Sequence, residues 1–575
     1  MRFTDKARLL AQIINWRLHW DRRDLEFHPG PGVSDKFITG RDAAARIPDG
    51  AAVISCGMAG NARCSAFFWA VGEHFQANGR PRGLTWLSVG AQGGRGKAPG
   101  SVEELGHEGL LKTYISGHLE TAKALLDLAE KGALEVQVLP QGEMALLIEG
   151  QGFGRDAVRS RTGIGTFLDP RCGKGSTLTP QGAPGLIEAD GDELVYRLPP
   201  IDVALFSASY ADAEGNIYLH DMATLTETYE AIAAARRNGG LVMAVVASLI
   251  EPGQHPVSVP AQDIDAVFVN PWNEQTVGAW QGKPWQLMTP GGDGDDRAAI
   301  DKLRFINKLL HITPTRGPVE EALGRLGARL FADVVPLDAH INIGVGFAEE
   351  VCREVCESNL RERYTFTTET GVYGGVPAPG IYFGGAVNPI RFESSAWMFR
   401  FYQENLDASV LGILQVDSEG NVNVSKRGPT IRDYVGPGGL PSIVASARIV
   451  IFIGTWMAGA KWKLDGGRMV LVRAGTPKFV DKVDEVTFSG PEALASGKQV
   501  YYATNVGTFH LTDDGLELMW LMPGIDVDRD ILANTTARVL IPDSPPAVDD
   551  SIVTGQGFDL SRPSTVGEGD SNARW

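Results

Sequence analysis

The sequence predicts an α/β protein with two related α/β domains, each built on a mostly parallel sheet. Two observations support this fold class. Apolar strand-like runs alternate with helical patterns along most of the chain, which is typical of βαβ units. The motif Asp-x-Glu-Gly-Asn-(Ile/Val) also occurs twice, at residues 212–217 and at residues 417–422, which indicates an internal repeat.

The first half begins with a strand, a turn and a helix. Residues 51–60 predict a strand that ends in a glycine turn, and residues 65–75 predict the helix. Residues 83–90 predict the next strand, which runs into a second glycine-rich loop. Residues 201–209 and 241–250 are continuous apolar runs, as expected for strands that are covered on both faces.

The second half repeats this order. Residues 340–355 predict a strand, a glycine turn and a helix, and the run Val410–Val416 predicts a strand just before the second copy of the motif. Gly and Asn tolerate positive φ, so both copies of the motif predict a tight turn. A shared turn alone would be weak evidence, but the repeated strand–turn–helix unit strengthens the case for two related halves.

The composition along the chain predicts five segments. Residues 1–37 are charged and amphipathic and predict a helical arm. The two domains are expected at residues 38–288 and 319–542, and the Gly- and Pro-rich stretch 289–318 is expected to link them. Residues 543–575 are rich in Pro, Ser, Gly and Asp, and predict a loose tail.

The size and charge of the chain limit its possible functions. A chain of 575 residues is too long for one core, and its 43% hydrophobic and 21% charged residues are typical of a soluble globular protein. The formal net charge of -17 argues against nucleic acid or an anionic membrane surface as the main partner. An anionic small ligand would need a local cluster of donors.

The cysteines and the apolar segments favour a cytoplasmic protein. A sparse, odd number of cysteines is typical of reduced thiols, and the N-terminus lacks the apolar region of a signal peptide. The most apolar segment, residues 443–454, carries Arg448 and is too short to span a bilayer. Cys352 and Cys356 are four residues apart on a predicted helix. Because no His lies near them, we interpret them as packing residues rather than metal ligands. The five cysteines are Cys56, Cys64, Cys172, Cys352 and Cys356.

Several common functional motifs are absent or incomplete. The chain has no Gly-x-Ser-x-Gly, which argues against a serine nucleophile elbow. Residues 173–177, GKGST, lack the Ser or Thr directly after Lys and the upstream Gly of a phosphate loop. Residues 344–350 have Glu349 where a dinucleotide fingerprint needs its third Gly. His107 and His118 are eleven residues apart, which is not a metal-ligand spacing, so we interpret them as structural.

Residues 364–390 contain a single charged side chain, Glu369, among Gly, Pro, Thr, aromatic and aliphatic residues. The residues alone leave three interpretations of Glu369: an ordinary exposed loop residue, a general base, or a nucleophile that forms a covalent intermediate. A carboxylate is a weak nucleophile, so the third interpretation requires positioning, worth roughly 7–11 kcal/mol. It also requires oxyanion donors, each worth about 2.7–4 kcal/mol.

Four glycine-rich turns between strands and helices could supply such donors, at residues 57–60, 93–96, 344–346 and 436–439. Backbone N–H groups at these turns can bind a phosphate, a carboxylate or an oxyanion. Each turn could instead be a tight connection without a ligand. Four such turns together with the isolated Glu369 favour a functional site.

These residues resemble a known family. From about residue 38 to residue 541 the chain resembles the single-chain family I CoA-transferases, such as the propionate, acetate and acetoacetate CoA-transferases. The matching motifs occur in the family's order, and their combination is more specific than any one of them. In the first half they are 107-HEGLLKTYISGH-118, 139-LPQG-142 and 162-TGIGTFLDPR-171; in the second half they are 342-NIGVGF-347, 369-ETGVYGGVPAPGIYFG-384, 416-VDSEGNVNVS-425, 436-GPGGL-440 and 513-DDGLELMWLMPGIDVDRDI-531.

The resemblance implies two open α/β domains of the CoA-transferase type, with mostly parallel sheets and with the active site in the cleft between the domains. It also implies a role for Glu369. In the family a Glu before such a glycine run attacks the acyl-CoA thioester and forms an acyl–glutamyl anhydride. The CoA thiolate then attacks the glutamyl carbonyl and leaves a glutamyl-CoA thioester. A second carboxylate reverses these steps in a ping-pong mechanism. Gln141 matches the glutamine that helps the oxyanion hole, and Gly438 or Gly439 matches the backbone donor.

The resemblance also implies the ligands and partners. Gly344 and Gly346 match the loop that approaches the coenzyme A, and we expect Gly436 to bind it as well. Neither a metal nor a redox cofactor is implied, because the coenzyme A thioester is a substrate. The expected partners are an acyl-CoA and small carboxylic acids, without nucleic acid or membrane. Relatives form homo-oligomers, so we expect a dimer or a tetramer.

The chain departs from the family pattern at two places. Residues 55–65, SCGMAGNARCS, replace a run such as GGFGG, and residues 403–405, QEN, replace three glycines. Trp397 and Arg400 lie just upstream of the second departure. If these residues line the acyl pocket, the pocket is smaller or more polar than in propionate-type enzymes.

The roles of the basic side chains stay open in the sequence. Arg391 and Arg400 either recognise the second carboxylate of a diacid or are surface arginines at strand ends. The CoA phosphates have two candidate sites, which the sequence does not rank. One is Arg95 with Lys97, and the other is Lys426 with Arg427.

Two other functions are compatible with the same residues. An acyl-CoA hydrolase would use the same site but let water resolve the intermediate. A non-catalytic acyl-CoA or ligand-binding protein would keep the fold without turnover. The presence of Glu369, Gln141 and the glycine loops together argues against the second alternative.

Overall fold

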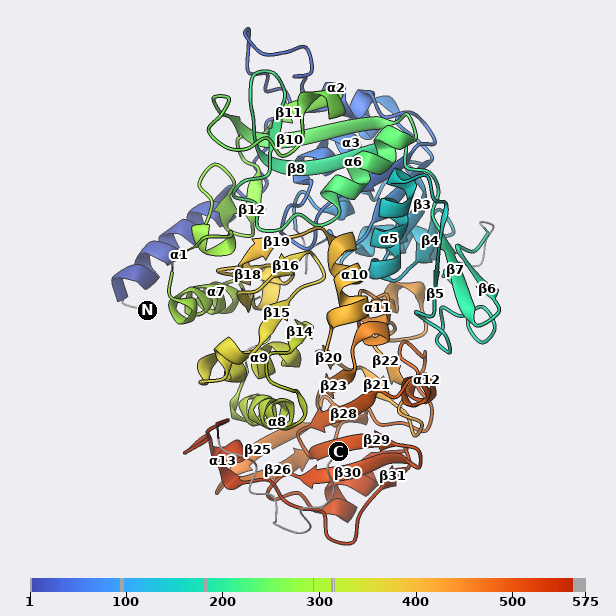
Figure 1. The fold of residues 1–575 in the computed structure, drawn as a ribbon, viewed down its shortest axis with the longest axis vertical. Coiled ribbons are helices and arrows are strands. Elements are labelled where there is room, and N and C mark those ends of the chain that lie inside the picture. Colours follow the sequence, from blue (N-terminus) through green and yellow to red (C-terminus); the bar gives the residue numbers. More distant parts are fainter. Residues whose placement is uncertain are drawn as a thin grey trace.

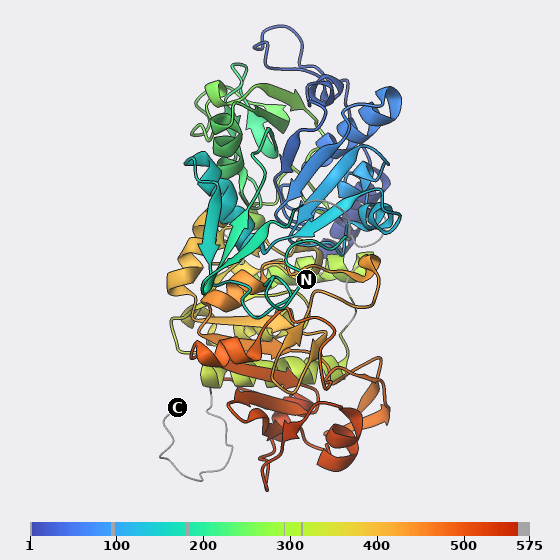
Figure 2. The ribbon, with the colours of Figure 1, turned by 90° about the vertical axis from the view of Figure 1, so that its right-hand side faces the viewer.

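The computed structural model describes residues 3–93, 98–179, 184–292, 294–311, 314 and 316–561. These residues form two lobes stacked along the long axis of the molecule (Figure 1). The blue-to-green part of the chain forms one lobe and the yellow-to-red part forms the other, and the view from the side shows the same division (Figure 2). The first helix, α1 (Phe3–Leu18), lies within the predicted N-terminal arm.

A parallel sheet organises the first lobe. Each neighbouring pair along its main path is parallel, and the short strand β9 (Ile217–Tyr218) pairs antiparallel with β8 (Val203–Ala211). The helices of this lobe are α2 (Gly40–Ala45), α3 (Ser65–Asn78), α4 (Lys123–Glu130), α5 (Gln141–Gly152) and α6 (Thr228–Arg237). In spatial order the strands are β11 (Ala266–Val269), β10 (Leu241–Leu249), β8, β1 (Ala52–Ser55), β2 (Leu84–Ser88), β3 (Leu111–Ser116) and β4 (Glu135–Val138).

The second lobe contains a sheet with a parallel centre and antiparallel flanks. The parallel centre runs β15 (Thr365–Thr367), β14 (His340–Ile343), β20 (Ala408–Gly412), β23 (Ile449–Ile453) and β28 (Gln499–Thr504). Beyond β15 lie β16 (Val372–Tyr373) and β19 (Arg391–Phe392); beyond β28 lie β29 (Gly507–Thr512), β30 (Gly515–Leu521) and β31 (Val539–Leu540). Its helices are α8 (Pro318–Val334), α9 (Phe347–Glu357), α10 (Ser395–Asn405), α11 (Leu440–Ser446) and α12 (Gly490–Ala495).

The two sheets share one arrangement of parallel strands. β1 lies between β2 and β8, as β14 lies between β15 and β20, and in both lobes two further parallel strands follow on the same side. The register of the pairs gives the equivalent positions. These are Val53, Trp86 and Val203 in the first lobe and Ile341, Phe366 and Ala408 in the second.

The repeated sequence motif occupies the same place in both lobes. Asp212 and Asp417 each lie nine residues after equivalent strand positions, Val203 and Ala408. Asp212 Oδ1 accepts hydrogen bonds from the backbone N–H groups of Glu214 and Asn216, at 3.0 and 3.1 Å. Asp417 Oδ1 accepts the same two bonds from Glu419 and Asn421, at 3.1 and 3.0 Å. The predicted tight turn is therefore confirmed in both copies, and its carboxylate stabilises it by satisfying two backbone donors.

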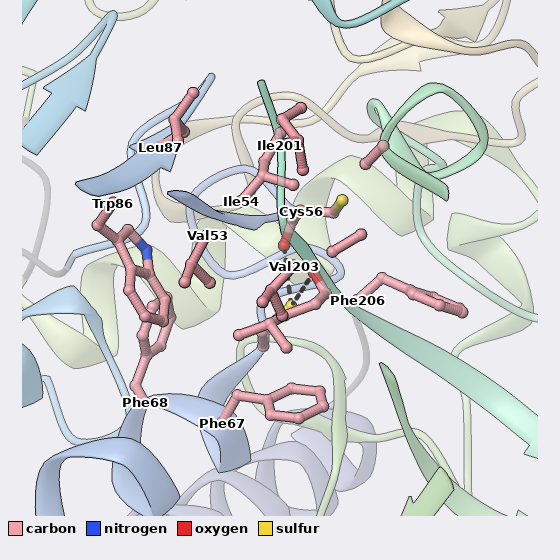
Figure 3. Close-up of a cluster of buried hydrophobic side chains, with 14 of the residues drawn as sticks. Val53, Ile54, Cys56, Phe67, Phe68, Trp86, Leu87, Ile201, Val203 and Phe206 are labelled. Carbon is pink, nitrogen blue, oxygen red and sulfur yellow. Dashed lines mark hydrogen bonds between the residues drawn. The ribbon is translucent and has the colours of Figure 1, made fainter. Parts of the chain in front are cut away.

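The core of the first lobe explains its apolar strands. Both faces of β1, β8 and β10 are covered, as the continuous apolar runs predicted. Trp86 on β2 is fully buried beside Phe68 of α3 (Figure 3). Its indole N–H donates to Ser55 Oγ at 2.9 Å, so the polar atom of the ring is satisfied inside the core. A buried aromatic ring of this kind typically stabilises a fold by about 3–5 kcal/mol relative to Ala.

Two segments predicted to lie outside the domains are in fact packed against them. The predicted linker contains helix α7 (Asp296–Leu310), which buries Leu303 and Ile306 against the aromatic residues around Tyr382. The predicted loose tail contains helix α13 (Asp550–Thr554), which buries Ile552 against the second lobe. Composition averaged over a segment misses such short amphipathic helices, because a few buried side chains are enough to hold them. The exact domain boundaries stay predictions, and residues 562–575 lie outside the described part.

Candidate active site

A cleft of about 1200 Å³ lies between the two lobes, at the carboxyl ends of the parallel strands of both sheets. The loops after β1, β2, β3 and β4 form one side, and those after β14, β15 and β20 form the other. Ligands of open α/β sheets typically bind at this edge. All seven residues singled out in the sequence line the cleft: Gln141, Gly344, Gly346, Glu369, Gly436, Gly438 and Gly439.

Glu369 is a buried carboxylate at the wall of this cleft. It follows β15 by two residues and is only 5% exposed, so the interpretation as an ordinary exposed loop residue is wrong. Burial raises the pKa of its carboxyl above the ordinary value, and hydrogen bonds from its own backbone N–H and from the Asn342 amide oppose this rise. Asn342 Nδ2 donates to Glu369 Oε2 at 3.3 Å. A desolvated carboxylate with one side-chain donor is suited to nucleophilic attack.

A chain of hydrogen bonds behind Glu369 fixes the orientation of Asn342. Thr367 Oγ1 donates to the backbone oxygen of Ile341 at 3.0 Å, so the hydroxyl of Tyr402 donates to Thr367 Oγ1 at 3.0 Å. The hydroxyl oxygen of Tyr402 in turn accepts from Asn342 Nδ2 at 3.1 Å. The amino group of Asn342 is therefore held between Tyr402 and Glu369. Asn342 belongs to the family motif at residues 342–347, but the sequence alone assigned it no role. The sequence contained no signal for Tyr402.

Gln141 begins helix α5, directly after the loop that follows β4. Its backbone N–H donates to the oxygen of Gly438 at 3.0 Å, and its side chain is 4% exposed. Its Oε1 has no hydrogen-bond partner among the described residues. If the terminal amide rotates by half a turn, Nε2 takes the place of Oε1. Nε2 could then donate a hydrogen bond to a developing oxyanion.

Gly439 lies between Gln141 and Glu369. A methyl group at this position would lie 3.2 Å from Gln141 Oε1 and 3.7 Å from Glu369 Cγ. Gly439 is also the residue just before helix α11, and its N–H makes no hydrogen bond to the described residues. The structure thus brings the nucleophile candidate, the amide candidate and one unengaged backbone donor together.

The neighbouring glycines of this loop serve a different purpose. The N–H of Gly438 donates to the oxygen of Gly117 at 2.7 Å, so this group is not available as an oxyanion donor. Of the two candidates, Gly439 is therefore the better one. Gly436 has φ +87° and a Cβ there would lie 2.7 Å from the Gly117 oxygen, while its own N–H donates to Ser425. Only glycine permits this contact between the lobes.

The loop after β14 also presents glycines without free donors. Gly344 N–H donates to the oxygen of Val410 at 2.8 Å, and Gly346 N–H donates to Glu349 Oε1 at 3.1 Å. Gly346 has φ +93°, and no atom lies within 4 Å of a Cβ built there. A Cβ on Gly344 would instead lie 3.1 Å from Leu411 Cδ2. Gly346 can therefore provide room for a ligand, whereas the N–H groups of both residues stabilise the loop itself.

The structure distinguishes among the basic residues that were considered as ligands of the CoA phosphates. Arg427 lines the cleft and makes an ion pair with Glu120 of the first lobe at 2.5 Å. Lys426 is not among the lining residues, and its ammonium lies 5.4 Å from the ring of Tyr434. Arg95 and Lys97 lie outside the described residues. A further basic residue, Lys478, lines the cleft and was not singled out in the sequence.

The second departure from the family pattern does not reach the cleft. Trp397, Arg400 and residues 403–405 are not among the described lining residues, so they do not make the pocket smaller or more polar. Arg400 pairs with Glu149 of α5, and Arg391 pairs with Glu393 at 2.9 Å while its guanidinium covers the Tyr373 ring. Both arginines therefore have partners within the protein.

The first departure does line the cleft, through Met58 and Arg63. Arg63 lies 3.7 Å from Glu274, which fixes it to the β12 (Glu274–Thr276) hairpin.

Of the predicted packing cysteines on α9, Cys352 is buried, and its sulfur lies 3.7 Å from the sulfur of Cys356. The described residues contain no group of three or more His, Cys, Asp or Glu side chains that could hold a metal ion. None of their helices is both long and apolar enough to cross a membrane.

The fold and this cleft define an enzyme of the coenzyme A transferase class, and comparison with known proteins gives the family. Residues 39–270 match the family described as coenzyme A transferase. The caffeate CoA-transferase of Acetobacterium woodii is 30% identical over 511 residues, which covers 86% of this chain and 93% of that protein.

Solved structures give the same result. The chain is similar to the acyl-CoA transferase YdiF of Escherichia coli O157:H7 as apoenzyme, with a TM-score of 0.80 and 27% identity over 92% of this chain and 98% of that one. It is equally similar to the thioester complex of YdiF with CoA, with a TM-score of 0.79, 27% identity and the same coverage. The chain belongs to the coenzyme A transferase family, as a single-chain family I member. It is an enzyme that transfers coenzyme A.

Proposed function

We propose that the protein transfers coenzyme A from an acyl-CoA to a free carboxylic acid by a ping-pong mechanism, with Glu369 as the nucleophile. The observation that carries this proposal is the position of Glu369. It is a buried carboxylate in the cleft, next to an amide side chain and an unengaged backbone N–H. The YdiF complex described as a thioester with CoA supports the same chemistry by analogy.

In the first half-reaction, a Glu369 oxygen attacks the thioester carbonyl and CoA leaves as a thiolate, which gives an acyl–glutamyl anhydride. The thiolate then attacks the glutamyl carbonyl, and the original acid leaves as a carboxylate. Glu369 now holds coenzyme A as a thioester. A second carboxylate attacks this thioester, and the returning thiolate forms the new acyl-CoA and frees Glu369. No step needs a metal or a redox cofactor.

The surrounding residues have separate tasks in these steps. Asn342 orients the Glu369 carboxylate through the hydrogen bond to Oε2. The Gly439 N–H and the Gln141 amide stabilise the oxyanion that forms at each carbonyl. Exclusion of water by the buried site protects the anhydride and the thioester from hydrolysis. We expect a homo-oligomer.

Intact mass spectrometry after mixing with a panel of acyl-CoA donors, without acceptor, tests the proposal. One added coenzyme A is expected in the parent, and none in Glu369→Gln. Glu393→Gln is the matched control, because Glu393 lies in the same part of the chain but pairs with Arg391 outside the cleft. Addition of a carboxylic acid should remove the adduct.

The other outcomes identify the alternative functions. Steady release of coenzyme A without acceptor and without an adduct would indicate an acyl-CoA hydrolase. Binding of acyl-CoA with no adduct and no release for any donor would indicate a non-catalytic binding protein. An adduct that persists in Glu369→Gln would refute the assignment of the nucleophile.

A further inference from the structure

Glu369 lies at the corner of a tight turn. The N–H of Gly371 donates to the oxygen of Thr368 at 3.1 Å, so Glu369 and Thr370 are the two central residues of the turn. Gly371 has φ +99°, and a Cβ there would overlap the oxygen of Glu393, so the turn requires glycine at this place. The direction of the Glu369 side chain therefore depends on how this turn is held.

The second lobe holds the turn by its side chains. The hydroxyl groups of Thr368 and Thr370 both donate to the backbone oxygen of Gly384, and the bond from Thr368 is 3.0 Å long. Both threonines are buried. Among the described residues of the second lobe, none donates a hydrogen bond to the backbone oxygen of Thr370. A buried carbonyl of this kind needs a partner from elsewhere.

The first lobe supplies the partners of this oxygen. Thr224 Oγ1 donates to the oxygen of Thr370 at 2.8 Å, and the N–H of Thr226 donates to the same oxygen at 3.2 Å. Both threonines lie in the loop between β9 and α6, and both are buried. Two donors of one lobe thus hold the residue next to the nucleophile candidate in the other lobe.

Thr226 is held in a conformation that its side chain disfavours. Its φ is +51°, in the left-handed region, which is rare and strained for a β-branched residue. In this conformation its N–H reaches Thr370, and its oxygen accepts from the N–H of Ser395, the first residue of α10, at 2.8 Å. The two hydrogen bonds to the second lobe offset the strain. Strained residues of this kind are typically found at functional sites.

The loop that carries these donors is anchored to helix α6. The oxygen of Leu225 accepts from the N–H of Thr228 at 3.3 Å and from its Oγ1 at 2.8 Å, so the loop is tied to the first turn of the helix. Helix α6 packs closely on α5, since a Cβ on Gly152 of α5 would lie 3.0 Å from Ala233 Cβ of α6. Helix α5 begins with Gln141. The loop therefore connects the turn of Glu369 with the helix that carries the amide candidate.

We propose that Thr224 is a positioning residue for the transfer of coenzyme A, with the backbone N–H of Thr226 as the second donor. Together they hold the oxygen of Thr370 and so keep Glu369 in place in the cleft. This inference rests on the proposed function, because it takes Glu369 to be the nucleophile. Thr224 is not among the described residues that line the cleft, so it acts through the turn and takes no part in bond making.

Thr224→Val tests the proposal, because Val keeps the shape of the side chain but removes the hydroxyl. The assay is a single turnover with acyl-CoA and no acceptor, stopped by rapid quench and followed by intact mass. The rate constant of adduct formation should fall about tenfold, and the acyl-CoA concentration at half-maximal rate should change less than about threefold. The fraction of enzyme that finally carries coenzyme A should stay the same. Thr224→Ser keeps the hydroxyl and should restore the rate constant to within about threefold of the parent.

Thr504→Val is a matched control. Thr504 is also fully buried, and its Oγ1 donates to the backbone oxygen of Gly507 at 2.9 Å, but it lies at the β28–β29 hairpin and does not line the cleft. Lost stability should lower only the fraction of enzyme that forms the adduct. A similar fall of the rate constant in Thr504→Val, or an unchanged rate constant in Thr224→Val, would overturn the proposal. If Thr224→Val does not fold, Thr224→Ala removes the same hydroxyl and has the same expected result.

Hydrogen exchange distinguishes failure of this inference from failure of the proposed function, because it needs no turnover. The backbone amides of residues 368–372 should exchange about tenfold faster in Thr224→Val than in the parent, and at the parent's rate in Thr504→Val. Unchanged exchange at this turn in Thr224→Val would overturn the inference, even if Glu369 forms the adduct. Faster exchange together with no adduct in the parent would instead refute the mechanism and leave the hold of Thr224 on the turn supported.

Discussion

The hydrogen bond from Asn342 to Glu369 makes a prediction about the pH dependence of the first half-reaction. Replacing Asn342 by Leu keeps a side chain of similar size but removes the donor 3.3 Å from Glu369 Oε2. This bond favours the ionised carboxylate, while burial opposes ionisation. Its loss should therefore raise the pKa of Glu369 further.

The size of this effect follows from the geometry. A hydrogen bond to a charged group is worth about 1.5–3 kcal/mol, and a donor–acceptor distance of 3.3 Å places this bond at the weaker end of that range. About 1.5 kcal/mol corresponds to a pKa shift of about one unit. Only the ionised carboxylate attacks, so activity is lost as the pH falls through this pKa. The acidic limb of the pH profile should move about one unit towards higher pH.

The assay is the pH dependence of kcat/KM for an acyl-CoA, which reports ionisations of the free enzyme. Below its acidic limb, Asn342→Leu should be about tenfold slower than the parent, beyond any difference at the pH plateau. Asn273→Leu is a suitable control. Asn273 is also a buried asparagine, but its Nδ2 donates to Ser207 Oγ in the first lobe at 2.8 Å.

An unmoved acidic limb in Asn342→Leu would refute the reasoning, because it would mean that this donor does not control ionisation of Glu369. A shift of the same size in Asn273→Leu would also refute it. In that case a general loss of packing, rather than the specific hydrogen bond, would explain the shift.

Two further variants test the geometry of the site and the repeated turn. Gly439→Ala is compatible with the backbone, at φ -81°, but its methyl group would lie 3.2 Å from Gln141 Oε1 and would displace the amide slightly. We expect kcat/KM to fall about tenfold, with an unchanged unfolding midpoint. A fully active variant would contradict the crowded geometry. Asp212→Ala removes the acceptor of four hydrogen bonds, including one from the Tyr218 hydroxyl, and should lower the free energy of unfolding by about 2–4 kcal/mol at pH 7. The pKa of Asp212 is lowered in the folded protein. The stabilisation by its carboxylate is therefore present above the pKa of the unfolded chain and is lost as the pH falls through the pKa of the folded protein. Chemical denaturation should show a smaller difference in unfolding free energy between variant and parent at pH 3 than at pH 7, and an equal difference at both pH values would contradict this.

Much of the fold could be predicted from the sequence because its signals are local. The apolar runs at β8 and β10 and the glycine turns after β1 and β14 follow from residue type and spacing alone. The segments α7 and α13 were not predicted, because polar composition hides the few side chains that they bury. Glu369 was predicted from its isolation within an uncharged stretch.

The partners of Glu369 depend on contacts between distant segments, which no local pattern reports. Asn342 and Tyr402 come from different elements and meet only in the folded second lobe. The N–H of Gly438 is engaged by Gly117 of the first lobe, so the choice between Gly438 and Gly439 could be made only in three dimensions. Lys478 gave no sequence signal, because its position in the lining of the cleft follows only from the folded structure.

The equivalence of the two sheets also identifies the position in the first lobe that corresponds to Glu369. Trp86 and Phe366 hold equivalent positions, so Val89, three residues after Trp86, stands where Glu369 stands in the second lobe. Val89 is buried, and its backbone oxygen packs against Gly117, the residue that also lies under the Gln141 side chain. One lobe thus has a buried carboxylate at this strand end, while the other has an apolar residue at the equivalent place. Residues of both lobes line the cleft beside Glu369, so neither lobe alone forms the whole cleft.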